Sequence, residues 1–202
     1  MDSQLSLFDS AICTPPSILG VQGILGLNYY PGLLTSEEQS EILSEIDKRP
    51  WQHDLKRRVQ HYGYKYDYRA RRLAPSMYVG DLPKFAVQVG QKLVSSGIIA
   101  IVPDQVIVNE YVPGQGITPH IDCKPCFRNT IVTVSLVSVY TMDFYSTTAE
   151  DMRSHDLELG SALVFSNEAR FEWKHGIKAR KADKGRRRGR RVSLTFRNVI
   201  LD

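Results

Sequence analysis

The segment HIDCKPC, residues 120–126, carries two sets of potential metal ligands side by side. His120 and Asp122 form a His-x-Asp pair, and Cys123 and Cys126 form a Cys-x-x-Cys pair. Two histidines and one carboxylate that leave coordination positions open are the ligands of non-haem Fe(II) oxygenases. A further histidine, His175, follows in the motif FEWKHG and would complete that set. The first pair therefore predicts an iron site for oxidative chemistry.

The cysteine pair offers less support for a site of its own. A structural zinc needs four ligands, and the one other cysteine, Cys13, lies near the N-terminus. A thioredoxin-like pair should open a helix, whereas CKPCF lies between predicted strands. An odd number of cysteines does not suggest a secreted disulfide framework, so we expect reduced thiols. The His/Asp pair is favoured, and the role of the cysteines stays open.

The residues around these motifs are typical of short strands after two helices. The helix signals lie in TSEEQSEILSEIDKR, with Thr35 or Ser36 as N-cap, and in LPKFAVQVGQKLVSSG. Later segments are rich in β-branched and aromatic residues and are separated by turn residues. They are QVIVNEYV, NTIVTVSLVSVY, TMDFYS, LELGSALVFS, FEWKH and RVSLTFRNVI. This order predicts an α+β domain on a β-sandwich or barrel, without a parallel sheet.

The strand period places polar side chains on one face, because residues two apart point to the same side. Such pairs are Asn109 with Tyr111, His120 with Asp122, and Trp173 with His175, and Arg191, Ser193 and Arg197 also lie at even offsets. Arginine can fork onto a carboxylate, so Arg191 and Arg197 fit a dicarboxylate cosubstrate. We therefore expect a barrel with a polar interior.

The bulk composition fits one globular domain of 202 residues, with 42% hydrophobic and 24% charged residues. The N-terminus shows no signal peptide and no segment is apolar enough for a membrane span, so we expect a cytoplasmic monomer. The net charge of +4 hides two basic segments. Residues 56–72 hold seven Lys/Arg against one Asp, and residues 178–191 hold nine against one Asp. These segments suggest contact with a polyanion, with solvated surface loops as the alternative.

The motifs NEYVPGQGITPHID, FEWKHG and RVSLTFR, in this order, resemble the AlkB family of Fe(II)/2-oxoglutarate-dependent dioxygenases. The resemblance covers roughly residues 50–200 and implies a double-stranded β-helix (jelly-roll) core over about 105–202 with flanking N-terminal helices. It implies that Fe(II), 2-oxoglutarate and O2 are used, with the iron held by His120, Asp122 and His175. It also implies that 2-oxoglutarate is bound by Asn109, Tyr111, Arg191, Ser193 and Arg197.

The segment RRVQHYGYKYDYR resembles the nucleotide-recognition lid of that family, here expected over about 50–80. Its tyrosines recur at every second residue between basic residues, as in proteins that stack unpaired bases. An amphipathic hairpin with its tyrosines on the core is the alternative. The expected substrate-binding residues are Arg57, Arg58, His61, Tyr62, Tyr64 and Trp173. The implied reaction is oxidative dealkylation of bases in single- or double-stranded DNA, which requires extrusion of a paired base.

One departure from the family pattern weakens the case for a DNA-repair substrate. DNA-repair members of the family commonly carry an acidic residue two positions beyond the iron-ligand Asp, and this chain has Lys124 there. An RNA or tRNA base hydroxylase or demethylase therefore remains an alternative. A protein demethylase and a non-catalytic nucleic-acid-binding module with the same fold are weaker ones.

The first residues carry a separate motif. QLSLF, with Gln4, Leu5, Leu7 and Phe8, resembles the pentapeptide with which bacterial repair proteins bind the sliding clamp. We expect residues 1–17 to form a flexible tail in front of a dioxygenase domain over 18–202. Clamp binding would favour DNA as the substrate.

Overall fold

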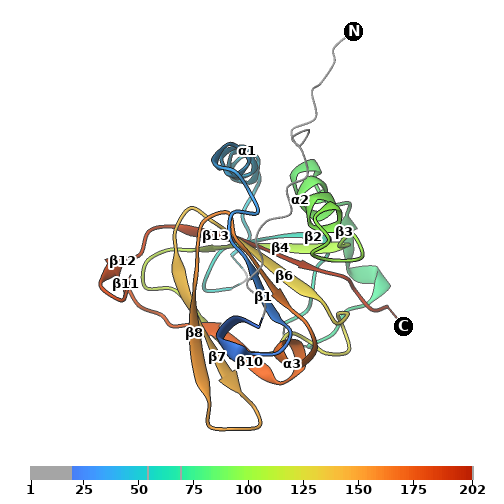
Figure 1. Ribbon diagram of the computed structural model, residues 1–202. Coiled ribbons are helices and arrows are strands. Elements are labelled where there is room, and N and C mark those ends of the chain that lie inside the picture. The colour runs from blue at the N-terminus through green and yellow to red at the C-terminus, as the bar shows by residue number, and fades with distance from the viewer. Residues whose placement is uncertain (1–19, 54, 69, 202) are drawn as a thin grey trace.

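Two antiparallel sheets face each other in the computed structural model, which describes residues 20–53, 55–68 and 70–201 (Figure 1). The larger, seven-stranded sheet has the order β1 (Leu27–Tyr30), β9 (Ala162–Phe165), β6 (Ile131–Leu136), β13 (Arg191–Arg197), β4 (Gln105–Tyr111), β2 (Val59–Tyr64) and β3 (Tyr78–Gly80). The smaller, four-stranded sheet has the order β5 (Ile117–His120), β10 (Trp173–Ile177), β7 (Tyr140–Ser146) and β8 (Met152–Leu157). The predicted α+β fold without a parallel sheet is confirmed.

Two helices cover the outer face of the larger sheet (Figure 1). They are α1 (Ser36–Asp47) and α2 (Lys84–Ser95). Thr35 caps α1 through a capping box with Glu38, as the sequence predicted. The shorter elements are the 3-10 helices η1 (Val21–Gly23) and η2 (Pro75–Met77), the helix α3 (Asn167–Phe171), and the hairpin of β11 (Ala182–Asp183) and β12 (Arg186–Arg187). No helix in the described ranges is long and apolar enough to cross a membrane.

The alternation along β13 and β4 separates the core from the site. Val192, Leu194 and Phe196 of β13 are buried in the cluster that joins the larger sheet to α1 and α2. Their neighbours in β13, among them Arg191 and Arg197, line a cavity on the other face of the sheet. Because β13 lies between β6 and β4, it is central in the sheet and holds its side chains on a rigid support.

The strand boundaries differ from the sequence prediction in one region. The predicted strand over residues 157–166 is split: β8 ends at Leu157, and β9 begins at Ala162 after a turn at Gly160. Strand β8 itself, with the sequence MRSHDL, was not predicted. It lies at the edge of the smaller sheet, where a largely polar strand can form because one of its sides is free of neighbouring strands.

The second basic segment, residues 178–191, is largely neutralised within the fold. Six of its nine basic side chains pair with carboxylates, namely Lys178, Arg180, Lys184, Arg186, Arg188 and Arg190. Arg188 and Asp183 form a pair in which both side chains are 0% exposed. Much of this segment therefore holds the β11–β12 hairpin in place, and its contact with a polyanion stays a prediction.

Candidate active site

The three predicted metal ligands meet at the end of the smaller sheet. His120 closes β5 and lies opposite His175 of β10 in the strand register, and Asp122 follows two residues later. One ligand atom from each residue lies within 4.8 Å of the others. His175 Nε2 is 3.6 Å from Asp122 Oδ2. The set of two imidazoles and one carboxylate is the donor set of a non-haem iron site, and its geometry fits a single ion.

A local hydrogen bond orients the first histidine. His120 Nδ1 lies 2.9 Å from the carbonyl oxygen of Thr118. A carbonyl oxygen can only accept, so this contact places the ring proton on Nδ1 and leaves Nε2 free for a metal. The ring of Phe165, whose centroid is 4.5 Å from that of His175, forms an apolar wall behind the second histidine.

Burial and the surrounding charges hold Asp122 and His175 in the protonation states that metal binding requires. Burial alone would raise the pKa of Asp122, but the surrounding positive charge, Arg197 foremost, holds it well below its usual range. Burial, assisted by His120, lowers the pKa of His175 to about 3. At neutral pH the site therefore offers a charged carboxylate and a neutral imidazole, which need no deprotonation before coordination.

Two buried arginines support Asp122. Arg197 Nη2 donates to Asp122 Oδ1 at 2.6 Å. Arg170 of α3 donates to the carbonyl oxygens of Asp122 at 3.0 Å and Cys123 at 3.1 Å. These bonds fix the backbone of the segment that follows β5. Arg170 carried no motif, so the sequence prediction did not include it.

A cavity of about 1020 Å³ opens beside the metal ligands and contains the predicted cosubstrate residues. Arg191 is 1% exposed and donates from Nη2 to Ser135 Oγ at 2.8 Å, while its Nε has no hydrogen-bond partner. Its guanidinium carbon lies 5.4 Å from the ring centre of Tyr111. No carboxylate of the described residues pairs with Arg191. A buried cation without a counter-ion, in a cavity beside a metal site, fits a ligand carboxylate such as that of 2-oxoglutarate.

The other cosubstrate candidates line the same cavity, namely Asn109, Tyr111, Ser193 and Arg197. Asn109 and Tyr111 lie on β4 directly opposite Ser193 and Arg191 of β13. Asn109 Oδ1 accepts a hydrogen bond of 2.8 Å from Nε of Arg57. The structure thus brings all five cosubstrate candidates together with the iron ligands.

Of the six substrate candidates predicted from the sequence, Arg57 lines this cavity and the other five do not. Tyr62 packs against Phe85 of α2 at 6.0 Å between ring centres, and Arg58 stacks on Trp51 at 4.7 Å. Tyr64 packs on Tyr78, with 5.3 Å between ring centres, and the buried His61 lies 6.3 Å from Tyr68 by the same measure. The guanidinium carbon of Arg153 lies 5.2 Å from the ring centre of Trp173. Tyr62 lies away from the cavity because the register of β2 pairs it with Val106, on the face of the sheet that the helices cover.

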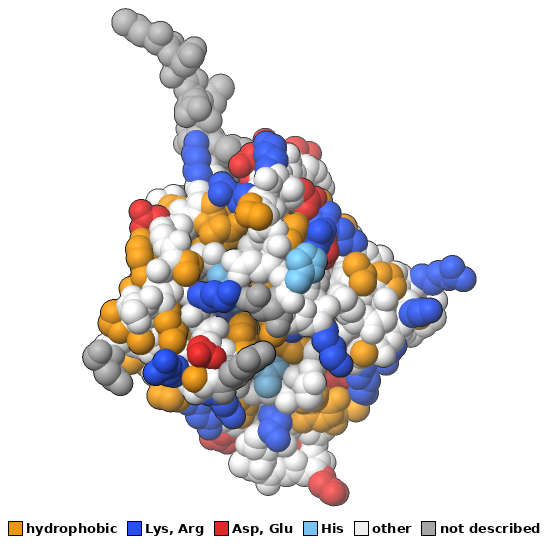
Figure 2. Space-filling view, turned by 180° about the vertical axis from the view of Figure 1, so that it is seen from behind, with side chains coloured by type: hydrophobic (Ala, Val, Ile, Leu, Met, Phe, Trp, Pro, Cys, Tyr) orange, Lys and Arg blue, Asp and Glu red, His pale blue; other side chains and the backbone are white. Residues whose placement is uncertain are grey.

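Other aromatic and basic side chains line the cavity where those candidates do not, namely Tyr66, Tyr68, Lys56, Arg71, Lys124 and Lys174. Tyr66 and Tyr68 pack edge to face at 5.0 Å, just beyond the end of β2. The tyrosine stripe in the sequence included both residues, but the strand end that turns them toward the cavity carries no signal of its own. On the face seen in Figure 2, blue Lys and Arg side chains lie on several sides of the pale blue histidines.

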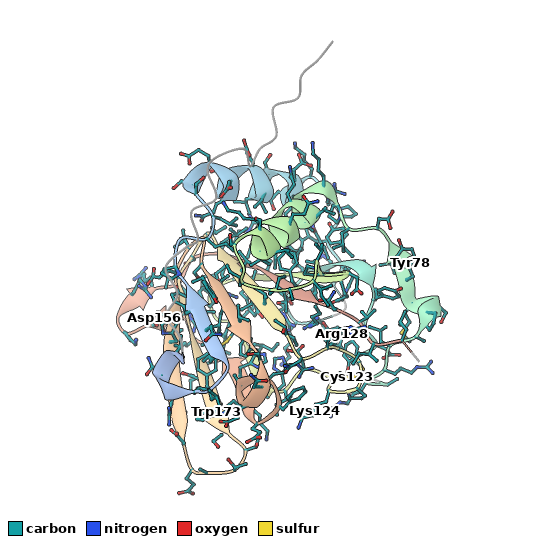
Figure 3. The ribbon with its side chains drawn as sticks, turned by 45° about the vertical axis from the view of Figure 1, so that its right-hand side comes forward. Tyr78, Cys123, Lys124, Arg128, Asp156 and Trp173 are labelled. Carbon is teal, nitrogen blue, oxygen red and sulfur yellow. A yellow bond between two sulfur atoms is a disulfide. The ribbon has the colours of Figure 1, made fainter. Side chains whose placement is uncertain are left out.

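The structure joins Cys123 and Cys126 in a disulfide, so the expectation of reduced thiols is wrong for this pair. Figure 3 shows Cys123 and Lys124 next to each other on the segment that follows β5. The cysteines pack with Tyr66, Phe127 and Val199 in a small cluster beside the cavity. The metal ligands and the cysteine pair are therefore neighbours with separate roles.

Comparison with known proteins agrees with this geometry. Residues 26–197 match the 2OG-Fe(II) oxygenase superfamily. The chain is 34% identical to the "Alkylated DNA repair protein ALKBH8 homolog" of Arabidopsis thaliana, over 93% of this chain and 62% of that protein. It is 32% identical to the "tRNA (carboxymethyluridine(34)-5-O)-methyltransferase ALKBH8" of Mus musculus, over 92% of this chain and 31% of that protein. The chain thus corresponds to less than two thirds of either relative.

The fold of the chain has also been seen in a solved structure, that of OsALKBH1. The two superpose with a TM-score of 0.66 at 19% identity, over 86% of this chain and 96% of that chain. At that identity the likeness concerns the fold, which is the two-sheet arrangement described above. Together with the triad of His120, Asp122 and His175, the matched sequence over most of the chain shows that it is a member of the AlkB-like 2OG-Fe(II) oxygenase family.

Proposed function

We propose that this chain oxidises a carbon substituent on a nucleobase of nucleic acid, and that alkylated DNA is its substrate. Hydroxylation of an N-alkyl carbon gives an unstable product that releases an aldehyde and restores the base. The observation that supports this proposal is the mouth of the cavity beside the metal ligands. It combines Tyr66 and Tyr68 with Lys56, Arg71, Lys124 and Lys174. Aromatic faces between cations are suited to stacking an unpaired base while phosphates are contacted.

In this proposal each part of the cavity has its own task. His120, Asp122 and His175 hold Fe(II), which with 2-oxoglutarate and O2 supplies the oxidising power and yields succinate and CO2. Arg191 and Tyr111 bind the distal carboxylate of 2-oxoglutarate. Asn109, Ser193 and Arg197 surround its other end.

The segment of residues 50–80 is proposed to act as a lid over the base. Its residues Tyr66, Tyr68 and Arg71 line the cavity, as does Arg57 near its start. Strand β2 anchors the segment to β4 of the larger sheet. A lid fixed at one strand can position a base without moving the residues that hold the metal and the cosubstrate.

RNA, and tRNA in particular, is the second candidate substrate. Lys124 stands where an acidic residue reads the damaged base in DNA-repair members of the family. The name of the mouse relative refers to a tRNA uridine, and that of the Arabidopsis relative to DNA. The motif QLSLF, which favours DNA, lies outside the described residues, as do Gln4, Leu5, Leu7 and Phe8.

One experiment separates these substrates. The iron-loaded protein is incubated with 2-oxoglutarate and single-stranded DNA or RNA of the same sequence, carrying methylated or etheno-adducted bases, and with bulk tRNA. Mass spectrometry of the nucleosides then identifies each product. Loss of alkyl groups from DNA supports the first proposal, and a product found only in tRNA supports the second. Unchanged bases in all three, under conditions in which succinate forms, would contradict both.

A further inference from the structure

Two neighbouring arginines just before β2, Arg57 and Arg58, point to opposite sides of the larger sheet. Arg58 pairs with Glu110, which Arg190 also contacts, on the side of the sheet that carries Trp51. Arg57 turns the other way and lines the cavity. Two adjacent residues of the same type thus have different environments, one a salt bridge and the other the cavity beside the metal ligands.

The position of Arg57 is fixed by two contacts within the cavity. Its Nε donates to Asn109 Oδ1 at 2.8 Å, and its guanidinium carbon lies 5.5 Å from the ring centre of Tyr111. Asn109 and Tyr111 are themselves buried on the rigid strand β4. The bond to Asn109 uses Nε, so the two η nitrogens remain as donors toward a ligand.

The charge of Arg57 has no counter-ion among the described residues. The described cavity lining includes seven basic side chains, Lys56, Arg57, Arg71, Lys124, Lys174, Arg191 and Arg197, and a single acidic one, Asp122. Asp122 already pairs with Arg197 and belongs to the metal-ligand set. Arg191 and Arg197 are assigned to the cosubstrate, and the exposed cations Lys56, Arg71, Lys124 and Lys174 to phosphates. Among the described basic side chains of the lining, Arg57 is therefore the one left to repel a positively charged base.

We infer that Arg57 is a specificity-determining residue that selects uncharged or anionic bases and excludes cationic alkylated ones. The inference rests on the proposed function, since it assumes that a nucleobase enters the cavity. Arg57 can donate its η hydrogens to a carbonyl oxygen, a ring nitrogen or a carboxylate on the base. A cationic base such as 1-methyladenine repels the guanidinium, and its amino group can only donate. The cognate substituents are thus neutral adducts or oxygen-bearing groups.

The test compares two adenine lesions that differ in charge. Single-stranded oligonucleotides of one sequence carry either 1-methyladenine, which is cationic at neutral pH, or the neutral 1,N6-ethenoadenine. Binding is measured by fluorescence anisotropy with the Mn(II)-loaded protein and 2-oxoglutarate, so that the readout does not depend on turnover. The variants are Arg57→Gln, Arg57→Glu and Arg57→Lys, with Arg58→Gln as the matched control of the neighbouring arginine.

We expect the wild type to bind the etheno oligonucleotide about tenfold more tightly than the methylated one, a difference of roughly 1.4 kcal/mol. Arg57→Gln should remove most of this preference, Arg57→Glu should reverse it, and Arg57→Lys should retain it because the charge is kept. Arg58→Gln should leave it unchanged. Equal binding of both lesions by the wild type, or a preference that survives Arg57→Glu, would overturn the inference. A preference that follows Arg57 without oxidation of any base would instead contradict the proposed function.

Discussion

Arg188 forms a buried ion pair with Asp183 in the β11–β12 hairpin, so its removal should lower the free energy of unfolding. In Arg188→Ala, Asp183 loses a bidentate partner, with bonds of 2.6 Å to Nε and 2.9 Å to Nη2. The carbonyl oxygen of Lys178 loses a donor at 2.7 Å. The ring of Tyr140 also loses the guanidinium that lies 4.2 Å from its centre.

The magnitude follows from what remains around Asp183. Breaking a buried ion pair by removing one partner costs about 3–5 kcal/mol, because a charge is left buried. Arg180 still contacts Asp183 at 2.6 Å, but its side chain is 38% exposed and compensates only in part. We therefore expect the free energy of unfolding to fall by about 3 kcal/mol. For a chain of this size the melting temperature should fall by roughly 10 °C.

Urea unfolding followed by circular dichroism measures this loss, with Arg187→Ala as the matched control. Arg187 is exposed on the same hairpin and has no carboxylate partner among the described residues. Its removal should change the free energy of unfolding by less than about 0.5 kcal/mol. If the two variants unfold at the same urea concentration, the pair of Arg188 and Asp183 does not stabilise the fold and the reasoning is refuted.

Three further predictions concern the site. Arg191→Ala should raise the 2-oxoglutarate concentration needed for half-maximal turnover by roughly 10- to 100-fold, since a charge-assisted bond is lost; an unchanged requirement in a succinate assay would remove Arg191 from the cosubstrate site. Burial lowers the pKa of His175 from 6.5 to about 3, so on acidification the unfolded chain takes up the proton first. As the pH falls between these values, the metal-free protein should therefore lose up to about 1.4 kcal/mol of unfolding free energy per pH unit. Urea titrations at several pH values should find a smaller slope in His175→Gln. Replacing both Cys123 and Cys126 by serine should preserve turnover, and stoichiometric zinc found by elemental analysis in the wild type but not in this variant would show a metal site at the cysteines.

The sequence predicted which metal and cosubstrate candidates share one cavity, because strand alternation is a local property. Asn109, Tyr111 and Arg191 recur at even offsets within strands, and the structure places them on one face. Their pairing across β4 and β13 follows once both segments are strands. The resemblance to the AlkB motifs supplied what alternation could not, namely the approach of His175 to His120, which the structure shows.

The side chains that line the cavity opening could not be predicted in the same way. Tyr62 and Tyr68 belong to one stripe in the sequence, but β2 ends at Tyr64, and only the residues beyond it turn to the cavity. Arg57 and Arg58 are likewise equivalent in sequence, and the register of β2 against β4 decides which of them faces Glu110. The ion pairs of residues 178–191 involve Asp47 and Asp156, which lie far away in the chain, so a charge run alone did not reveal them.

The coupling between cosubstrate turnover and base oxidation tests the proposed function most directly. Succinate and modified nucleoside are quantified by mass spectrometry in the same reaction, with an etheno-adducted oligonucleotide as substrate. Wild-type protein should form about one succinate for each base oxidised, and Asp122→Ala and His120→Ala should form neither product while remaining folded by circular dichroism. Succinate without any altered base in the oligonucleotide, or base oxidation that persists in Asp122→Ala, would contradict the assignment.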